Sequence, residues 1–185
     1  MTIAPTTEWG GGLILPFGDS LPNVAEDVFL AQGATVIGDV EIGSGCNVWY
    51  GSTLRGDVNI IRVGENTNIQ DGTVVHVTRK THGTFIGSGC TIGHGAIIHG
   101  CTLEDGCYIG MRATVMDGAI VQSGAMIAAG ALVTPGKCVP SGQLWAGSPA
   151  KLMRELRPDE LEYMNDAALH YAELGRKYRT RLNGM

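Results

Sequence analysis

The 185-residue sequence lacks several features that mark common classes of protein. No apolar run approaches the roughly 18 residues that a membrane-spanning helix needs. Its first residues, MTIAPTTEWGGG, lack the basic start and apolar stretch of a signal peptide, so we expect none. Positive charge is scarce, since 13 Lys and Arg stand against 18 Asp and Glu, whereas nucleic-acid-binding surfaces are usually basic. We therefore expect neither a membrane nor a nucleic acid as a partner.

A disulfide framework is missing as well. The five cysteines are odd in number and follow no framework spacing, which favours a reducing compartment and a cytoplasmic protein. The 28 glycines have no triplet period, so the chain is not collagen-like. A hydrophobic fraction of 44% argues against disorder and allows one domain with a real core.

What the sequence does contain is a six-residue period that starts at Leu30. The repeated aliphatic positions are Leu30, Val36, Ile42, Val48, Leu54, Val63, Ile69, Val75, Ile86, Ile92, Ile98, Leu103, Ile109, Val115, Val121, Ile127 and Val133. In most repeats a small residue follows four positions later, as at Ala34 and Cys46. A period of six cannot keep one face of a 3.6-residue helical turn inward, but short strands joined by bends can bury both positions in a β-solenoid. Three strands make one triangular coil, so 17 repeats predict between five and six coils.

The period is interrupted by insertions, which in a solenoid become loops on one face. Three extra residues lie between Leu54 and Val63, and about five lie between Val75 and Ile86. Near the C-terminus an amphipathic stripe follows a helix-start signal. The expected organisation has four parts: an N-terminal strand or cap over 1–29, a β-helix over 30–140, a linker over 141–157 and an α-helix over 158–182 that packs on the β-helix.

Counting three strands per coil places three ionisable side chains in one stack. Arg55, His76 and His99 each follow an aliphatic residue of the same face, on successive coils. Neighbouring strands lie about 4.8 Å apart, so the imidazoles of His76 and His99 can share one metal ion at roughly 2.0 Å per nitrogen. His94 falls on a different face, where it stacks over Asp71.

A catalytic zinc site needs three protein ligands, and His94 lies around the corner from His76 and His99. A neighbouring copy of the chain can supply the third ligand, which makes a ring-shaped homo-oligomer with threefold symmetry the natural arrangement. Each metal ion would then lie between two subunits. We expect Zn²⁺, with Fe²⁺ or Co²⁺ as alternatives, because three histidines suit all of them.

These residues make the chain resemble the γ-class carbonic anhydrases, in the branch without the long acidic loop. The resemblance rests on the RGD segment at 55–57, the NIQDG segment at 68–72, His76, and the spacing of His94 and His99. It covers almost the whole chain. It implies a left-handed parallel β-helix and a homotrimer with metal ions at the subunit interfaces. His76 and His99 would come from one subunit and His94 from the next.

The resemblance also implies the activity, a reversible hydration of CO₂ to bicarbonate by a metal-bound hydroxide, which makes the protein a lyase. The residues implied in catalysis are Arg55, Asp57, Asn68, Gln70, Asp71 and Tyr163. Arg55 would bridge subunits through Asp57 and Asp71 and help to hold bicarbonate. Gln70 and Asn68 would orient the metal-bound water and the substrate. Tyr163 matches, through a loose alignment, a Tyr-x-Asn pair on the family's helix.

The proton relay departs from the family prototype. Val58 stands where the prototype has a Glu, directly after the Asp of its Arg-x-Asp element. The short basic loop TRKTH at 78–82 replaces an acidic loop that carries a proton-shuttling Glu. Because imidazoles titrate near neutral pH, we hypothesise that His82 substitutes as the shuttle; the alternative is an ordinary surface histidine.

Two other functions fit the same repeat. Hexapeptide acyltransferases use this solenoid, and often a Gly-x-Pro-Ala-Lys segment like the one from Gly147 to Lys151, but they need one catalytic histidine and a cleft for an acyl carrier. A non-catalytic trimeric scaffold that keeps a metal ion is the second alternative. The stacked pair of His76 and His99 argues against an acyltransferase, whereas only an assay of CO₂ hydration separates an enzyme from the scaffold.

Overall fold

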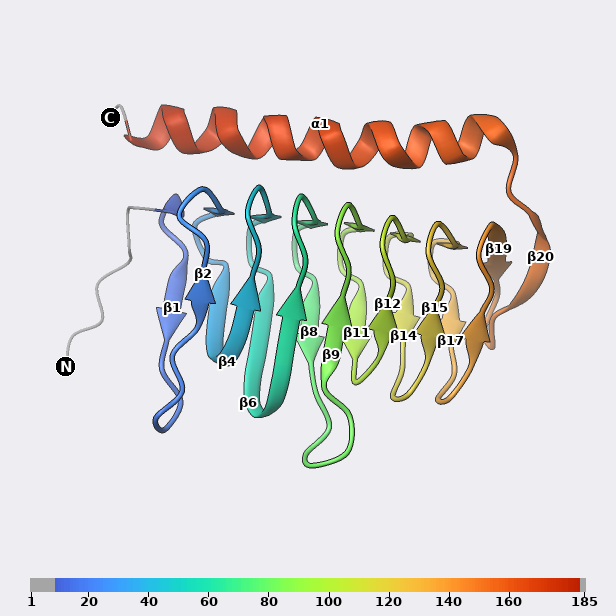
Figure 1. The fold of residues 1–185 in the computed structure, drawn as a ribbon, viewed down its shortest axis with the longest axis horizontal. Helices are drawn as coiled ribbons and strands as arrows, with labels where there is room; N and C mark the ends of the chain where they lie inside the picture. Colours follow the sequence, from blue (N-terminus) through green and yellow to red (C-terminus); the bar gives the residue numbers. More distant parts are fainter. Residues whose placement is uncertain (1–8, 184–185) are drawn as a thin grey trace.

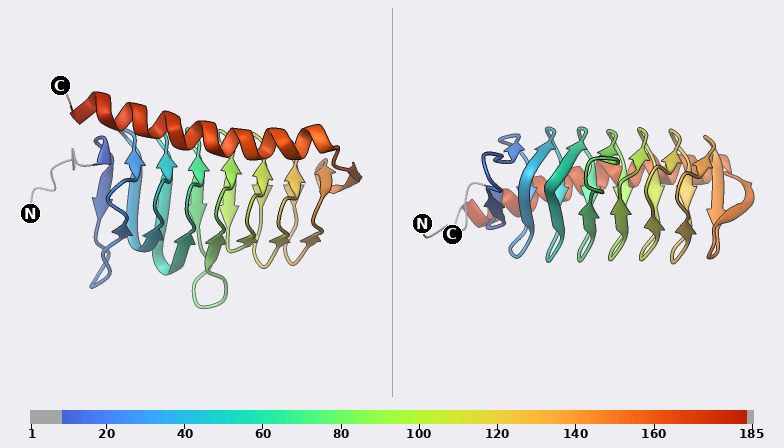
Figure 2. Two further views of the ribbon diagram at one scale, coloured as in Figure 1. Left: turned by 45° about the horizontal axis from the view of Figure 1, so that its top comes forward. Right: turned by 90° about the horizontal axis from the view of Figure 1, so that it is seen from below.

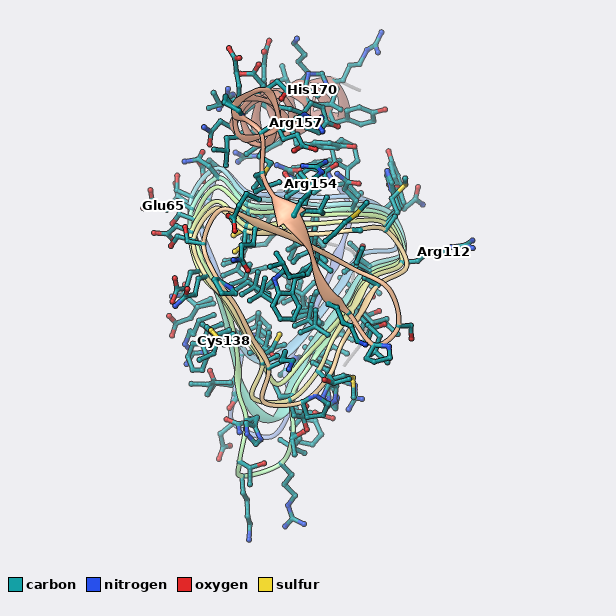
Figure 3. All side chains as sticks on the ribbon, turned by 90° about the vertical axis from the view of Figure 1, so that its right-hand side faces the viewer. Glu65, Arg112, Cys138, Arg154, Arg157 and His170 are labelled. Atoms are coloured by element: carbon teal, nitrogen blue, oxygen red, sulfur yellow. The ribbon has the colours of Figure 1, made fainter. Side chains whose placement is uncertain are left out.

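The computed structural model describes residues 9–183 and shows a parallel β-solenoid of about seven turns with one helix, α1 (Pro158–Asn183), along it (Figure 1). Viewed along its axis the coils superpose as a triangle, with the helix against one side (Figure 3). The expected left-handed parallel β-helix with a C-terminal helix is thereby confirmed. Among the described residues, no helix combines the length and apolar character needed to span a bilayer.

One side of the triangle is an eight-stranded sheet that lies beneath α1. Its strands are β3 (Phe29–Leu30), β5 (Asn47–Val48), β7 (Asn68–Ile69), β10 (Thr91–Ile92), β13 (Tyr108–Ile109), β16 (Met126–Ile127), β19 (Gln143–Ala146) and β20 (Lys151–Glu155). All pair in parallel except β20, which runs antiparallel to β19. The views in Figures 1 and 2 agree that α1 runs back along this side from the last coil to the first.

The other two sides belong to a single twelve-stranded sheet. The second side contains β1 (Leu13–Leu15), β8 (Val74–His76), β11 (Ile97–His99), β14 (Thr114–Val115) and β17 (Leu132–Val133). The third contains β2 (Asn23–Val24), β9 (Thr84–Ile86), β12 (Thr102–Leu103), β15 (Ile120–Val121) and β18 (Cys138–Val139). Two long strands, β4 (Thr35–Ile42) and β6 (Thr53–Val63), bend around the corner and pair on both sides, which joins them into one sheet.

The interior is filled by the aliphatic and small residues of the repeat. On the second side the stacked aliphatic residues are all completely buried: Val36, Leu54, Val75, Ile98, Val115 and Val133. Each pairs in register with the next, as the count of three strands per coil predicts. Burial of one such side chain stabilises the fold by about 1.5–3 kcal/mol, so a continuous column of them makes the coils stack in one register.

On the first side, glycine directly follows some of the aliphatic residues of the repeat, such as Ile92 and Ile109. The backbone of the next coil lies directly against these glycines. A Cβ at Gly93 would lie 2.7 Å from Met111 N, and a Cβ at Gly110 would lie 2.4 Å from Ala129 N. Neither glycine has a positive φ. These two glycines, which directly follow an aliphatic residue, are therefore required by the close approach of neighbouring coils, about 4.8 Å apart, and not by the conformation of a turn.

The solenoid is longer than the repeat predicts. About seven turns form instead of between five and six, because β1 and β2 pair with β4 at one end and β18 and β19 continue the coil at the other. The expected linker over 141–157 is wrong, since β19 and β20 form an antiparallel pair across the turn at 147–150. Residues 1–8 of the expected N-terminal cap lie outside the described residues.

The two insertions meet at the corner between the second and third sides. The first does not form the loop that we expected, because its residues lengthen β6 around the corner. The second forms a projecting loop over 77–83, which Figure 1 shows below β8 and β9. Backbone hydrogen bonds between Thr78 and His82, of 2.9 and 3.4 Å, close this loop.

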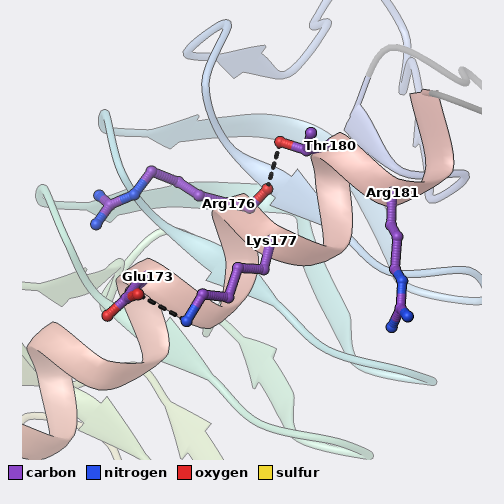
Figure 4. A pocket seen from close by; sticks show the side chains of 5 residues that line it. All are labelled: Glu173, Arg176, Lys177, Thr180 and Arg181. Atoms are coloured by element: carbon purple, nitrogen blue, oxygen red, sulfur yellow. Dashed lines mark hydrogen bonds and ion pairs between the residues drawn. The ribbon is translucent and has the colours of Figure 1, made fainter.

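α1 is held on the first side by aromatic packing. Phe29 and Trp49 are buried, and Tyr171 and Tyr178 of the helix pack edge-on against Trp49 at ring-centroid distances of 5.7 and 5.2 Å. Near its C-terminal end the helix also carries a pocket lined by Glu173, Arg176, Lys177, Thr180 and Arg181 (Figure 4). There Lys177 pairs with Glu173 at 2.6 Å.

The start of α1 depends on Glu160. Its carboxylate accepts hydrogen bonds from both Nη atoms of Arg154, at 2.7 and 2.8 Å, and from the backbone N–H of Arg157 at 2.9 Å. These donors, Arg154 first, lower the pKa of Glu160 from its ordinary value of 4.5 to about 2. Because the folded-state pKa is depressed, the ionised carboxylate stabilises the fold above pH 4.5, and this contribution is lost as the pH falls through about 2.

We expect Glu160→Gln to lower the midpoint of thermal unfolding at pH 7. The difference from wild type should narrow steadily between pH 4.5 and about 2, and thermal melts followed by circular dichroism across this range measure it. Glu162→Gln, on the exposed side of the same helix, serves as the control and should change little. A difference from wild type that stays constant with pH would contradict the role of the Glu160 charge.

Candidate metal centre

Three successive coils bring Arg55, His76 and His99 to the corner where both insertions lie. The strands that carry them are in register, with Val75 opposite Ile98 and His76 opposite His99. Each of the three side chains is the residue that follows a buried aliphatic, so it points out of the solenoid. The stack predicted from the repeat is therefore present.

The two histidines of the stack face each other. His76 Nδ1 lies 3.1 Å from His99 Nε2, and the ring centroids are 5.1 Å apart. Two nitrogens that bind one tetrahedral zinc ion at about 2.0–2.1 Å lie roughly 3.3–3.4 Å from each other. The pair is thus close to the spacing that a shared metal ion requires.

A carboxylate engages the other ring nitrogen of each histidine. Asp57 Oδ1 lies 3.1 Å from His76 Nε2, and the second oxygen of Asp57 accepts a hydrogen bond from Arg55. Asp117 Oδ1 lies 2.5 Å from His99 Nδ1. Carboxylates that accept the second N–H of an imidazole are the usual outer partners of histidines that bind metal. The donor set and its partners therefore fit a divalent metal ion.

Both carboxyl groups favour the ionised form. Partial burial raises the pKa of Asp57, but the hydrogen bonds from Arg55 and His76 outweigh burial and hold it below its ordinary value. Burial likewise raises the pKa of Asp117, and the hydrogen bonds from Thr78 and His99 again lower it overall. Each histidine of the pair therefore contacts a negative charge at neutral pH.

His94 lies at a different corner, in the turn that follows β10. Its Nδ1 is 2.8 Å from Asp71 Oδ2, and both side chains are about half exposed. The carbonyl of His94 accepts a hydrogen bond of 2.8 Å from the backbone N–H of Arg112, which Figure 3 labels at the right-hand corner of the triangle. Stacking of His94 over Asp71, away from His76, agrees with the register count.

Gln70 and Asn68 belong to the same side as His94 and lie on the covered face of the first sheet. Asn68 is fully buried and Gln70 is 5% exposed. Asn68 Nδ2 donates to Thr91 Oγ1 at 2.8 Å, and Gln70 Nε2 donates to Asn68 Oδ1 at 3.1 Å. This chain of amides holds Gln70 rigidly next to Asp71.

Comparison with known proteins gives close relatives along most of the chain. A relative named gamma carbonic anhydrase 2, mitochondrial, from Arabidopsis thaliana is 50% identical over 161 residues, which cover 84% of this chain. A carbonic anhydrase of Geobacillus kaustophilus is 36% identical over 167 residues, covering 90% of this chain and 91% of that relative. The chain belongs to the γ-carbonic anhydrase family. It spans 58% of the length of the Arabidopsis relative.

Family-model and structural matches agree with the hexapeptide-repeat solenoid. The model described as "Bacterial transferase hexapeptide (six repeats)" matches residues 83–115 and 100–135. A solved structure of a hexapeptide transferase family protein from Anaplasma phagocytophilum has a TM-score of 0.86 at 47% identity. The match covers 90% of this chain and 98% of that one.

A single chain of this γ-carbonic anhydrase family member places the predicted site residues at two separate corners. One corner holds Arg55, Asp57, His76 and His99, and another holds His94 with Asp71. Among the residues described, 9–183, no three His, Cys, Asp or Glu side chains are grouped to hold a metal ion. The pair of His76 and His99 and the predicted third ligand thus lie apart within one chain.

Tyr163 packs against a tyrosine of the first sheet. It lies in the first turns of α1, 57% exposed, with its ring 5.9 Å from that of Tyr108 on β13. Burial, and then the hydrogen bond with Tyr163, raises the pKa of Tyr108. Within one chain the ring of Tyr163 therefore contacts the ring of Tyr108 on β13.

Asp117 and Thr78 join the histidine pair without having been predicted from the sequence. Asp117 directly follows Met116, which the register count puts in the same stack as His99, but that count does not show which way the Asp117 side chain turns. Thr78 opens the inserted loop, and its Oγ1 donates to Asp117 Oδ2 at 2.6 Å. No periodicity marks either residue as a partner of a histidine.

Proposed function

We propose that this protein catalyses the reversible hydration of CO₂ to bicarbonate with a divalent metal ion, as a homotrimer with a site at each subunit interface. The observation that carries the proposal is the approach of His76 Nδ1 to His99 Nε2 at 3.1 Å, with a carboxylate on the far nitrogen of each ring. Membership of the γ-carbonic anhydrase family supports it.

The metal would be held by His76 and His99 of one copy and by His94 of a neighbouring copy. His94 is half exposed at its corner, so it is free to face another subunit. Zinc is the first choice, with iron or cobalt as alternatives, because imidazole nitrogens suit all three. When bound, such an ion supplies a Lewis acid that lowers the pKa of water.

The surrounding residues of the chain would attract bicarbonate and orient the bound water and the substrate. Arg55 is 43% exposed beside the histidine pair, so its guanidinium can attract bicarbonate while Asp57 fixes its position. Gln70, on the neighbouring copy's half, would present an amide held by Asn68 toward the bound water and substrate. Asp71 would complete the link between the two halves.

A cytoplasmic location is part of the proposal. All five cysteines are free, and four of them are buried. Burial raises the pKa of Cys46 and of Cys101 to about 12, which keeps these thiols protonated and unreactive. A chain with five free thiols suits a reducing compartment.

An acyltransferase is the second candidate. The name of the Anaplasma phagocytophilum structure, a hexapeptide transferase family protein, and the GSPAK segment at 147–151 favour it. This alternative requires no metal and no second histidine, so dependence on a metal ion separates the two functions.

Stopped-flow measurement of CO₂ hydration tests the proposal. The metal-free protein and protein reconstituted with Zn²⁺, Co²⁺ or anaerobic Fe²⁺ are compared, with release of coenzyme A from acetyl-CoA followed in parallel. We expect hydration only after reconstitution, with kcat/KM of at least about 10⁴ M⁻¹ s⁻¹, and no acetyl-CoA turnover. Stoichiometric metal without hydration would indicate a scaffold, and metal-independent release of coenzyme A would indicate an acyltransferase.

A further inference from the structure

One carboxylate connects the inserted loop to the histidine pair. Asp117 lies in the turn after β14, one coil beyond His99. Its Oδ1 accepts from His99 Nδ1 at 2.5 Å, and its Oδ2 accepts from the hydroxyl of Thr78 at 2.6 Å. Both oxygens of a single side chain are thus used, one by a residue of the solenoid and one by a residue of the loop.

The backbone leaves space for the Asp117 side chain to reach His99. Gly100, which follows His99, has a φ of +57°, and a Cβ placed on it would lie 2.5 Å from Asp117 Oδ1. Any other residue at this position would occupy the space of the carboxylate. The backbone N–H of Gly118 also donates to the carbonyl of Gly100 at 2.7 Å, which fixes the turn that carries Asp117.

The hydrogen bond to Asp117 determines which nitrogen of His99 carries the proton. With Nδ1–H donating to the carboxylate, Nε2 keeps its lone pair, and Nε2 is the atom that lies 3.1 Å from His76. A neutral imidazole has one N–H and one acceptor nitrogen, so holding one end decides the other.

We propose that Asp117 is a positioning residue that fixes the tautomer and orientation of His99 for metal binding. Thr78 holds Asp117 in place, so the loop over 77–83 contributes to metal affinity without supplying a ligand. This inference rests on the metal site of the proposed function. It adds the carboxylate and the hydroxyl to the residues that build that site.

Metal affinity and the His99 tautomer together test the inference. Co²⁺ is titrated into the metal-free full chain in competition with a chelator. Asp117→Ala is expected to weaken binding by about 10- to 100-fold, and Asp117→Asn, which keeps the shape and one acceptor oxygen, by less. Thr78→Val should cause a smaller loss, and this loss should vanish in the Asp117→Ala background because Thr78 acts through the carboxylate.

Asp105 offers a matched control on another corner of the solenoid. Its Oδ1 accepts a hydrogen bond of 2.7 Å from the backbone N–H of Ser88. A Cβ on Gly87 would lie 2.4 Å from that oxygen, so Gly87 leaves space for Asp105 as Gly100 does for Asp117. Asp105→Ala removes a comparable carboxylate from a turn with no histidine partner. It should leave Co²⁺ affinity unchanged, which separates positioning from general support of the coil.

The tautomer is read without metal, from ¹⁵N chemical shifts of the imidazoles. His99 should carry its proton on Nδ1 in the wild type and lose this preference in Asp117→Ala. Unchanged Co²⁺ affinity together with an unchanged tautomer would overturn the inference. Failure of the wild type to bind any metal would overturn the proposed function instead, while loss of the tautomer preference would still support the role of Asp117.

Discussion

Mixing two inactive variants is expected to restore about one quarter of the wild-type metal content and CO₂ hydration. His76→Ala removes a ligand from one half of the proposed site, and His94→Ala removes the ligand of the other half. In a threefold ring each site joins His76 of one copy to His94 of the next, so every mixed trimer has one intact junction of three. Random assembly at equal amounts gives roughly three quarters mixed trimers, hence about one quarter of the sites.

The mixed protein is made by co-expression with two different affinity tags, and bound metal per chain and stopped-flow rates are measured. A mixture of His76→Ala with His99→Ala is the control, because both residues lie on the same half and no junction becomes complete. This control should stay inactive. Recovery in the control, or none in the His76→Ala and His94→Ala mixture, would contradict a site shared between copies.

The fold could be predicted where aliphatic residues recur at a fixed spacing, because each of them fills the interior of the solenoid. Val36, Leu54 and Val75 fill the same interior column, so their spacing gives the strands, the coils and the register together. The outermost coils were not predicted, because neither lies between two other coils. Leu13–Leu15 pairs with a coil on one edge only, and Gln143–Ala146 has the antiparallel β20 on its outer edge, so neither needs the small residue and close glycine of an internal coil.

The site was predictable to the level of the backbone and no further. Register counting placed His76 over His99 and His94 over Asp71, because a repeat fixes which Cα atoms are neighbours. It could not find Asp117, whose side chain turns back across a coil to reach His99 through the space left by Gly100. Side-chain direction depends on such local space, which the period of a sequence does not contain.

We propose that protons leave the site through the loop over 77–83. His82 lies exposed in this loop against two glycines of the neighbouring coils: a Cβ on Gly118 would be 3.2 Å from His82 Nε2, and one on Gly100 would be 3.0 Å from His82 Cβ. These glycines flank the turn of Asp117 and the strand of His99. An imidazole there is both near the corner of the histidine pair and open to solvent, as a proton relay must be.

We expect His82→Ala to lower kcat for CO₂ hydration by about 100-fold at low buffer concentration, the lower end of the range for acid–base catalysis. The value of kcat/KM should stay near wild type, because transfer of the proton to solvent follows the conversion of CO₂. Added imidazole buffer should restore kcat by replacing the missing side chain. Stopped-flow rates across a buffer series measure both parameters.

Arg79→Ala is the matched control for the His82 variant. Arg79 is exposed in the same loop but has no group that exchanges protons near neutral pH, so its loss should leave the buffer dependence unchanged. If His82→Ala kept the wild-type kcat and the same buffer dependence, His82 would be an ordinary surface residue. The proton would then leave by another route, since Val58 provides no carboxylate beside Asp57.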